Sequence, residues 1–156
     1  MRPLFASLPA VVLGFVLFAA AQAAAADIEV RGAWIRTPPP GAPTAAGYAT
    51  IVNHAISSDR LTGAHASVAA SVVPHQMSMA GGIMRMRPMT GGAPIGASAS
   101  LTFSPNGDHL MLIGPKGPLK AGTHVKVTLR FQRAGAIAAD FVVRDAAPGG
   151  MAGMHM

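Results

Sequence analysis

The chain has 156 residues, a length that predicts a single domain, and only 12% of its residues are charged. Its formal net charge is +6, but the basic residues are spread along the chain and no aromatic platform lies beside them, which argues against nucleic-acid binding. Because the chain has no cysteine, disulfides, thiolate metal sites and cysteine nucleophiles are excluded.

Residues 1–26 have the layout of a secretory signal peptide. Arg2 is the one charged residue, an apolar run follows over residues 11–21, and Ala21-Gln22-Ala23 is a small-x-small cleavage motif. We predict cleavage between Ala23 and Asp27, and therefore a periplasmic protein with no stable membrane insertion. The alternative is an uncleaved N-terminal anchor, which we disfavour because the strongly apolar part is too short to span a bilayer.

After this segment, nine short stretches have β-strand character, and turn-forming residues separate them. They are residues 28–36, 48–53, 60–65, 71–79, 83–87, 98–103, 109–113, 124–131 and 136–143. Strands at this spacing predict an all-β, antiparallel sandwich or barrel, which we assign to one domain over residues 27–145. Helix is nearly absent, and residues 64–73 are the one candidate, for about one turn. The Gly-rich residues 146–156 are expected to form a flexible tail.

The unusual feature of the chain is the placement of methionine and histidine. Nine methionines follow Met1, and five of them fall within the 13 residues 77–89, directly after His75. Another lies in the triplet His109-Leu110-Met111, and the last three lie in the tail. A hydrophobic core would not concentrate methionine in this way.

A hairpin with Gly81-Gly82 as its two-residue turn would bring these side chains together, since the pair suits the positive φ angles of a primed turn. Met79 would then lie opposite Met84 and Met77 opposite Met86, with His75 diagonal to Met86. Residues two apart on a strand share a face, so sulfur and imidazole would converge on one face. Arg85 and Arg87 would point to the other.

His109 and Met111 repeat the same-face spacing on a separate predicted strand. Two such segments facing each other could present two imidazoles and two thioethers, with one methionine to spare. Thioether sulfur is soft and uncharged, so it suits Cu(I) and is a poor ligand for Zn²⁺, Mg²⁺ or Ca²⁺, while imidazole binds either copper oxidation state. The pattern therefore predicts a copper site at His75, Met86, His109 and Met111, with Met77 as an auxiliary candidate.

Other interpretations of the same residue types stay open. A single histidine on a strand is more often a hydrogen-bonded or surface residue, and we interpret His54, His65 and His124 in that way. A methionine cluster can also be a flexible contact surface, which would make the chain a structural β-sandwich module without a metal. A blue-copper centre is excluded because it needs a Cys thiolate. A copper enzyme would usually need several histidines or an organic redox partner, so we expect no enzyme.

Three segments carry a resemblance to a known family: residues 33–41 (AWIRTPPPG), residues 75–88 (HQMSMAGGIMRMRP) and residues 109–112 (HLML). With the strand at residues 48–53, they resemble the PCuAC family of periplasmic copper chaperones over roughly residues 28–143. The family motif is a His, ten residues, a Met, and a more distant His-x-Met. The resemblance implies a cupredoxin-like Greek-key β-sandwich that holds one Cu(I) through His75, Met86, His109 and Met111.

The resemblance also implies a function, namely delivery of copper toward the CuA centre of cytochrome c oxidase. We therefore expect a Cu(I) metallochaperone that passes the ion by ligand exchange to a CuA domain or to another assembly chaperone. A copper buffer or resistance protein is the alternative.

The tail is a candidate for a second, weaker copper site. It contains three thioethers and an imidazole, to which Cu(II) could bind as well as Cu(I). These side chains belong to Met151, Met154, His155 and Met156.

Overall fold

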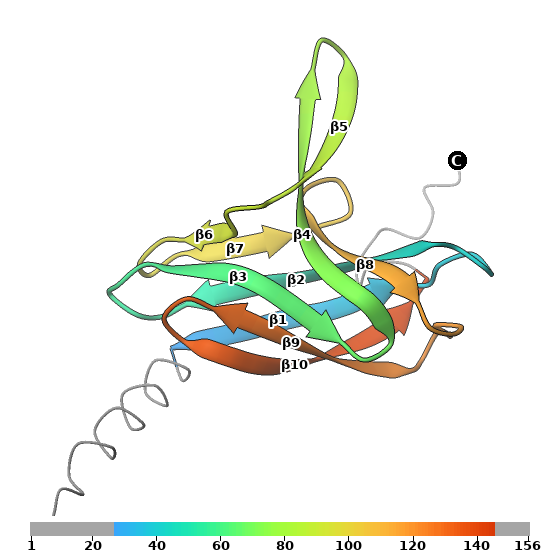
Figure 1. Cartoon of the computed structure of the whole chain (residues 1–156). Coiled ribbons are helices and arrows are strands. Elements are labelled where there is room, and N and C mark those ends of the chain that lie inside the picture. Colours follow the sequence, from blue (N-terminus) through green and yellow to red (C-terminus); the bar gives the residue numbers. More distant parts are fainter. Residues whose placement is uncertain (1–26, 146–156) are drawn as a thin grey trace, which may run out of the picture.

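The computed structural model describes residues 27–145, so the predicted signal peptide and tail lie outside the described residues. The described chain consists of strands joined by turns and loops (Figure 1). They are β1 (Ile28–Arg36), β2 (Thr44–Asn53), β3 (Asp59–Ala66), β4 (Ala69–Ala80), β5 (Ile83–Pro88), β6 (Ala93–Ile95), β7 (Ser100–Phe103), β8 (His109–Pro115), β9 (His124–Phe131) and β10 (Gly135–Arg144).

The strands form one sheet in the order β5-β4-β8-β2-β1-β10-β9-β3-β6, and β7 pairs with β2. The path from β4 to β3 closes on itself, because Ala64 of β3 pairs with Val72 of β4. The all-β, cupredoxin-like class predicted from the sequence is thus confirmed. One pairing differs from an all-antiparallel arrangement: β1 and β10 run parallel, with Trp34 opposite Val142.

The core lies inside this closed sheet, and strands such as β9 direct every second side chain inward. Its largest fully buried side chains come from seven strands and include Ile35, Ile51, Leu61, Leu112 and Phe141. On β8, for example, Leu110 and Leu112 are buried, while the alternate residues face the other way. Among residues 27–145, no helix has the length and apolar character needed to cross a membrane.

Two details of the sequence interpretation were wrong. The helical turn expected within residues 64–73 does not form: Ala66 ends β3, a two-residue turn follows, and Ala69 begins β4. Ala66, Ala69 and Val72 are buried as strand residues, because burial in the sheet outweighs weak helix propensity. The short strand β6 was not predicted, since three residues are too few for a periodic pattern.

Candidate metal centre

The β4–β5 hairpin has the register that the sequence predicts. Gly81 and Gly82 form its turn, with φ angles of 60° and 77° that a residue with a Cβ adopts only at a cost. Met79 pairs with Met84 and Met77 with Met86. The hairpin projects from the body of the sheet (Figure 1), so its methionines extend away from the core.

The strand β8 brings the remaining candidates beside this hairpin. It pairs with β4 so that His75 lies directly opposite His109 and Val73 opposite Met111. Residues that are opposite, or two apart, share one face of a sheet, so both histidines and Met77, Met86 and Met111 lie on the same face. The two segments are therefore neighbours in one sheet rather than strands on facing sheets.

Both imidazoles are oriented in the same way by the backbone. The Nδ1 atom of His75 lies 3.1 Å from the carbonyl oxygen of Val73, and that of His109 lies 3.2 Å from the carbonyl oxygen of Gly107. A carbonyl oxygen only accepts, so each Nδ1 carries the proton and donates it. In the neutral form of each ring, Nε2 then keeps a free lone pair, which is the state that a metal ion needs.

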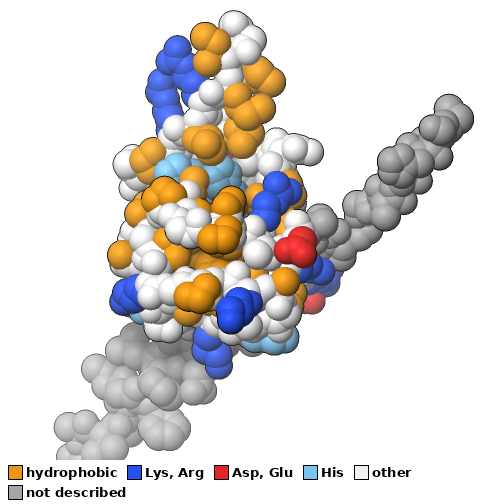
Figure 2. Space-filling model, turned by 90° about the vertical axis from the view of Figure 1, so that its right-hand side faces the viewer, with side chains coloured by type: hydrophobic (Ala, Val, Ile, Leu, Met, Phe, Trp, Pro, Cys, Tyr) orange, Lys and Arg blue, Asp and Glu red, His pale blue; other side chains and the backbone are white. Residues whose placement is uncertain are grey.

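The two rings are stacked, with centroids 5.8 Å apart and planes 11° from parallel. His109 is buried, with 4% of its surface exposed, whereas His75 is half-buried and Met86 is 55% exposed. The centre thus has a fixed, buried side at β8 and an open side at the hairpin. In Figure 2, histidine side chains are visible at the base of the projecting hairpin.

A hollow of about 280 Å³ adjoins the centre and is lined by Met77, Met86, His109 and Met111. Its other wall includes the loop after β1 and Tyr48 of β2, which the sequence interpretation did not include. Burial raises the pKa of the Tyr48 hydroxyl above its ordinary value, and the charge of Arg36 opposes the rise only in part. The hydroxyl therefore stays neutral and is no competing anionic ligand.

Asp108 is a second residue that sequence reasoning missed. Its Oδ1 atom accepts a hydrogen bond of 3.0 Å from the backbone N–H of Met77. Met77 lies just beyond the last β4–β8 pair, where β4 has no further partner on that side. The Asp108 carboxylate therefore holds the base of the hairpin beside the start of β8, one residue before His109.

The donor set is neutral and soft. The two imidazole nitrogens and the thioethers carry no negative charge. Among the described residues, His, Cys, Asp and Glu side chains nowhere gather in a group of three or more that could hold a metal ion without methionine. A hard divalent cation prefers several oxygen ligands. The arrangement therefore favours a soft ion of low charge.

Three other histidines lie outside this face. His54 hydrogen-bonds Glu29 at 2.8 Å, His124 hydrogen-bonds Asp140 at 2.6 Å, and His65 is exposed on β3. The tail candidates Met151, Met154, His155 and Met156 lie outside the described residues.

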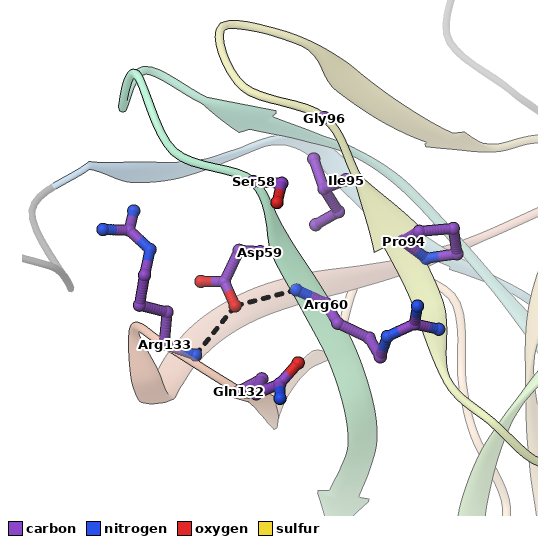
Figure 3. Close-up of a pocket in the computed structure, with 8 residues that line it drawn as sticks. All are labelled: Ser58, Asp59, Arg60, Pro94, Ile95, Gly96, Gln132 and Arg133. Carbon is purple, nitrogen blue, oxygen red and sulfur yellow. Dashed lines mark hydrogen bonds between the residues drawn. The ribbon is translucent and has the colours of Figure 1, made fainter.

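A larger hollow, of about 460 Å³, lies between the start of β3, β6 and the β9–β10 turn (Figure 3). Its polar anchor is the buried Asp59, whose Oδ1 accepts the backbone N–H of Arg60 at 2.7 Å and of Arg133 at 2.8 Å. Its Oδ2 accepts the N–H of Ala134 at 3.0 Å. All three bonds go to backbone, so this carboxylate holds the β9–β10 turn against β3.

Comparisons with known proteins agree with this fold. The family model described as "Putative lipoprotein LpqE-like" matches residues 28–143. The relative "Putative lipoprotein Lxx21020" of Leifsonia xyli subsp. xyli (strain CTCB07) is 33% identical over 104 residues, 67% of this chain. The matched part is 61% of that relative, so the chain covers less than two thirds of its length.

Solved structures with the same fold include a PCuAC domain and two forms of one Deinococcus radiodurans protein. The copper-bound PCuAC domain from PmoF2 is 27% identical, with a TM-score of 0.63 over 78% of this chain and 94% of that one. Apo-DR1885 from Deinococcus radiodurans is 30% identical, with a TM-score of 0.60 over 94% and 93%. The Cu(I) form of DR1885 is 31% identical, with a TM-score of 0.57 over 73% and 76%.

Proposed function

We propose that this chain, which belongs to the LpqE-like family, binds one Cu(I) ion through His75, Met86, His109 and Met111. The observation that carries the proposal is the shared hydrogen-bond pattern of the two histidines. It leaves two Nε2 lone pairs on the face that also bears the thioethers. The names of the solved structures support the choice of ion, since one is copper-bound and another is a Cu(I) form.

The chemistry of the site explains why Cu(I) suits it better than other ions. Thioether sulfur is soft and does not titrate, and an imidazole can complete the coordination of either copper state. Methionine also tolerates an oxidising compartment better than a thiol, which is lost to disulfide formation. A chain with no cysteine and a predicted signal peptide fits a copper site outside the cytoplasm, and we assign it to the periplasm.

The open side of the centre suits transfer rather than permanent storage. His75 is half-buried and Met86 is 55% exposed, so an acceptor's ligands can approach the ion while His109 still holds it. Ligand exchange of this kind needs no redox change and no catalytic group. We therefore assign the chain a metallochaperone role, with the CuA centre of cytochrome c oxidase as the acceptor.

A transfer assay tests this role. The Cu(I)-loaded chain is mixed anaerobically with an apo CuA domain, and copper is quantified on each protein after separation. If the chain is a chaperone, most of its copper should be found on the acceptor after the two proteins are separated. Retention of copper by the chain, with tight binding intact, would instead identify a copper buffer or resistance protein.

We predict that Met77 contributes less to copper binding than Met86. Met77 lies opposite Met86 and is half-buried, but the motif that the sequence resembles does not include it, so we rank it as a packing neighbour or auxiliary ligand. Met→Leu keeps the approximate volume and removes the sulfur. An anaerobic competition titration with a Cu(I) chelator should show a larger loss of affinity for Met86→Leu than for Met77→Leu. Equal losses would place both sulfurs on the ion.

We also propose that the tail collects copper for the centre. The described chain ends at Asp145, next to Arg144, which pairs with Arg36 at the edge of the hollow beside the metal centre. An extended segment of the tail's length could reach at most about 40 Å, so its thioethers and His155 can approach the centre from there. The tail ligands must lose chain entropy to close around an ion, which makes this site the weaker one, for Cu(I) or Cu(II).

Cutting the chain after Asp145 tests the tail. We expect the full chain to bind a weaker copper equivalent that the shortened chain lacks, while the tight equivalent remains in both. Equilibrium dialysis against buffered copper measures the number of tight and of weaker copper equivalents that each chain binds. The same stoichiometry and the same loading rate in the two chains would leave the tail without a copper role.

A further inference from the structure

The outer part of the β4–β5 hairpin stands free of the rest of the sheet. The last β4–β8 pair is His75 with His109, and β5 pairs only with β4. Five residues of β4 therefore extend past the body, held by β5 and by the Asp108 bond to Met77. Figure 2 shows hydrophobic side chains gathered on one side of this projection and basic side chains on the other.

Four thioethers form two cross-strand pairs on the same face of this hairpin. Met77 faces Met86 at its base, and Met79 faces Met84 nearer to its tip. Directly opposite residues have Cβ atoms about 5 Å apart, and successive pairs on one face are spaced by about 7 Å along the strands. The outer pair thus lies one step beyond the inner pair, which itself adjoins the two histidines.

Packing does not account for the outer pair. Met79 is 67% exposed and Met84 is 58% exposed, and neither belongs to the hydrophobic core, whereas Met89 packs against it. Exposed thioethers give little folding free energy and are open to oxidation to the sulfoxide. Met79 and Met84 lie directly opposite each other, on the face of the hairpin that also bears the histidines. A site in which both sulfurs bind one ion requires this placement.

We propose that Met79 and Met84 form an outer Cu(I) site, from which the ion passes through Met77 and Met86 to the histidine centre. The inference rests on the copper role proposed above for the inner site. In each step a new bond from copper to sulfur, or in the last step to a neutral imidazole nitrogen, forms before an old Cu–S bond breaks, so the copper stays Cu(I) and no proton moves. The outer site has sulfur ligands only and is exposed, and is therefore the weaker site.

The direction of transfer follows from the exposure of the residues. Exposure falls from 67% at Met79 to 55% at Met86 and 4% at His109. Each step inward exchanges solvent-exposed sulfur ligands for a more buried set, and the last adds two oriented imidazoles. Arg85 and Arg87 alternate with these methionines along β5, so their positive charges lie on the opposite face of the hairpin.

The test uses the full chain without its predicted signal peptide, with ¹³C-labelled methionine methyl groups, titrated anaerobically with Cu(I). The first equivalent should shift the methyl signals of Met86 and Met111, and a later equivalent those of Met79 and Met84. The double variant M79L/M84L should lose that later outer-site equivalent and keep the first. Met89→Leu is the matched control and should keep both. Tail binding is read separately from the Met151, Met154 and Met156 signals.

Loading kinetics test the transfer path. In a stopped-flow experiment with a Cu(I) chelate, M79L/M84L should load the inner site several-fold more slowly than the original chain while reaching the same final affinity. Unshifted Met79 and Met84 signals, or an equal loading rate, would overturn the inference. A double variant that keeps the outer equivalent but no longer supplies an acceptor protein would also overturn it, in favour of a docking surface. Absence of shifts at Met86 and Met111 would instead contradict the proposed function.

Discussion

Replacing His109 by Phe should weaken Cu(I) binding by about 100-fold or more. Loss of a residue that merely orients a metal ligand typically costs about 10- to 100-fold, and here a nitrogen ligand itself is removed. Phenylalanine keeps a planar ring beside His75, whose ring centroid lies 5.8 Å away, so the packing of the buried site is largely preserved. The lost Nδ1–H bond to Gly107 should cost about 1 kcal/mol of stability.

Competition with a Cu(I) chelator measures this loss, with a thermal melt to confirm that the variant is folded. His124→Phe is the matched control, because His124 is exposed and hydrogen-bonds Asp140 on a different part of the sheet. It should bind Cu(I) like the original chain. If the two variants had the same affinity, His109 would not be a ligand.

Asp59→Ala should destabilise the fold by about 3 kcal/mol. Three backbone N–H groups, of Arg60, Arg133 and Ala134, donate to this buried carboxylate. Each bond to a charged group contributes roughly 1.5–3 kcal/mol, and buried donors that lose their acceptor also lose their solvation, although such effects do not simply add. The variant would free the β9–β10 turn from β3.

Urea denaturation at neutral pH measures the change in the free energy of unfolding. Asp59→Asn, which keeps one oxygen acceptor, should lose less stability than Asp59→Ala. Asp140→Ala, at an exposed carboxylate, should stay within about 0.5 kcal/mol of the original chain. The hollow at Asp59 shares no residue with the hollow at the metal centre, so Cu(I) affinity should be unchanged. A loss below 1 kcal/mol for Asp59→Ala would mean that the turn is held by other contacts.

The local parts of the fold and of the site could be predicted from the sequence. Gly81-Gly82 specifies a two-residue turn, and a two-residue turn fixes the register of both strands that it joins. The pairing of Met77 with Met86 and of Met79 with Met84 follows from that register alone. The strands β1 and β9 have the predicted bounds because turn residues delimit them clearly.

The non-local parts could not be predicted in this way. Nothing near His75 in the sequence specifies that His109, on β8, becomes its direct cross-strand neighbour; that contact depends on how β8 inserts between β4 and β2. The parallel pairing of β1 with β10 joins opposite ends of the domain. Asp59 occupies an ordinary position at the start of a strand, and its importance comes from a turn more than seventy residues later.

X-ray absorption spectroscopy of the Cu(I)-loaded chain ending after Asp145 tests most directly whether His75, Met86, His109 and Met111 hold the ion. All ten strands lie within the residues retained, and the tail's sulfur and imidazole ligands are absent from the sample. The proposed site predicts one copper ion per chain with a mixed shell of nitrogen and sulfur neighbours. A shell of oxygen and nitrogen alone would contradict the assignment, because it would leave both thioethers off the metal.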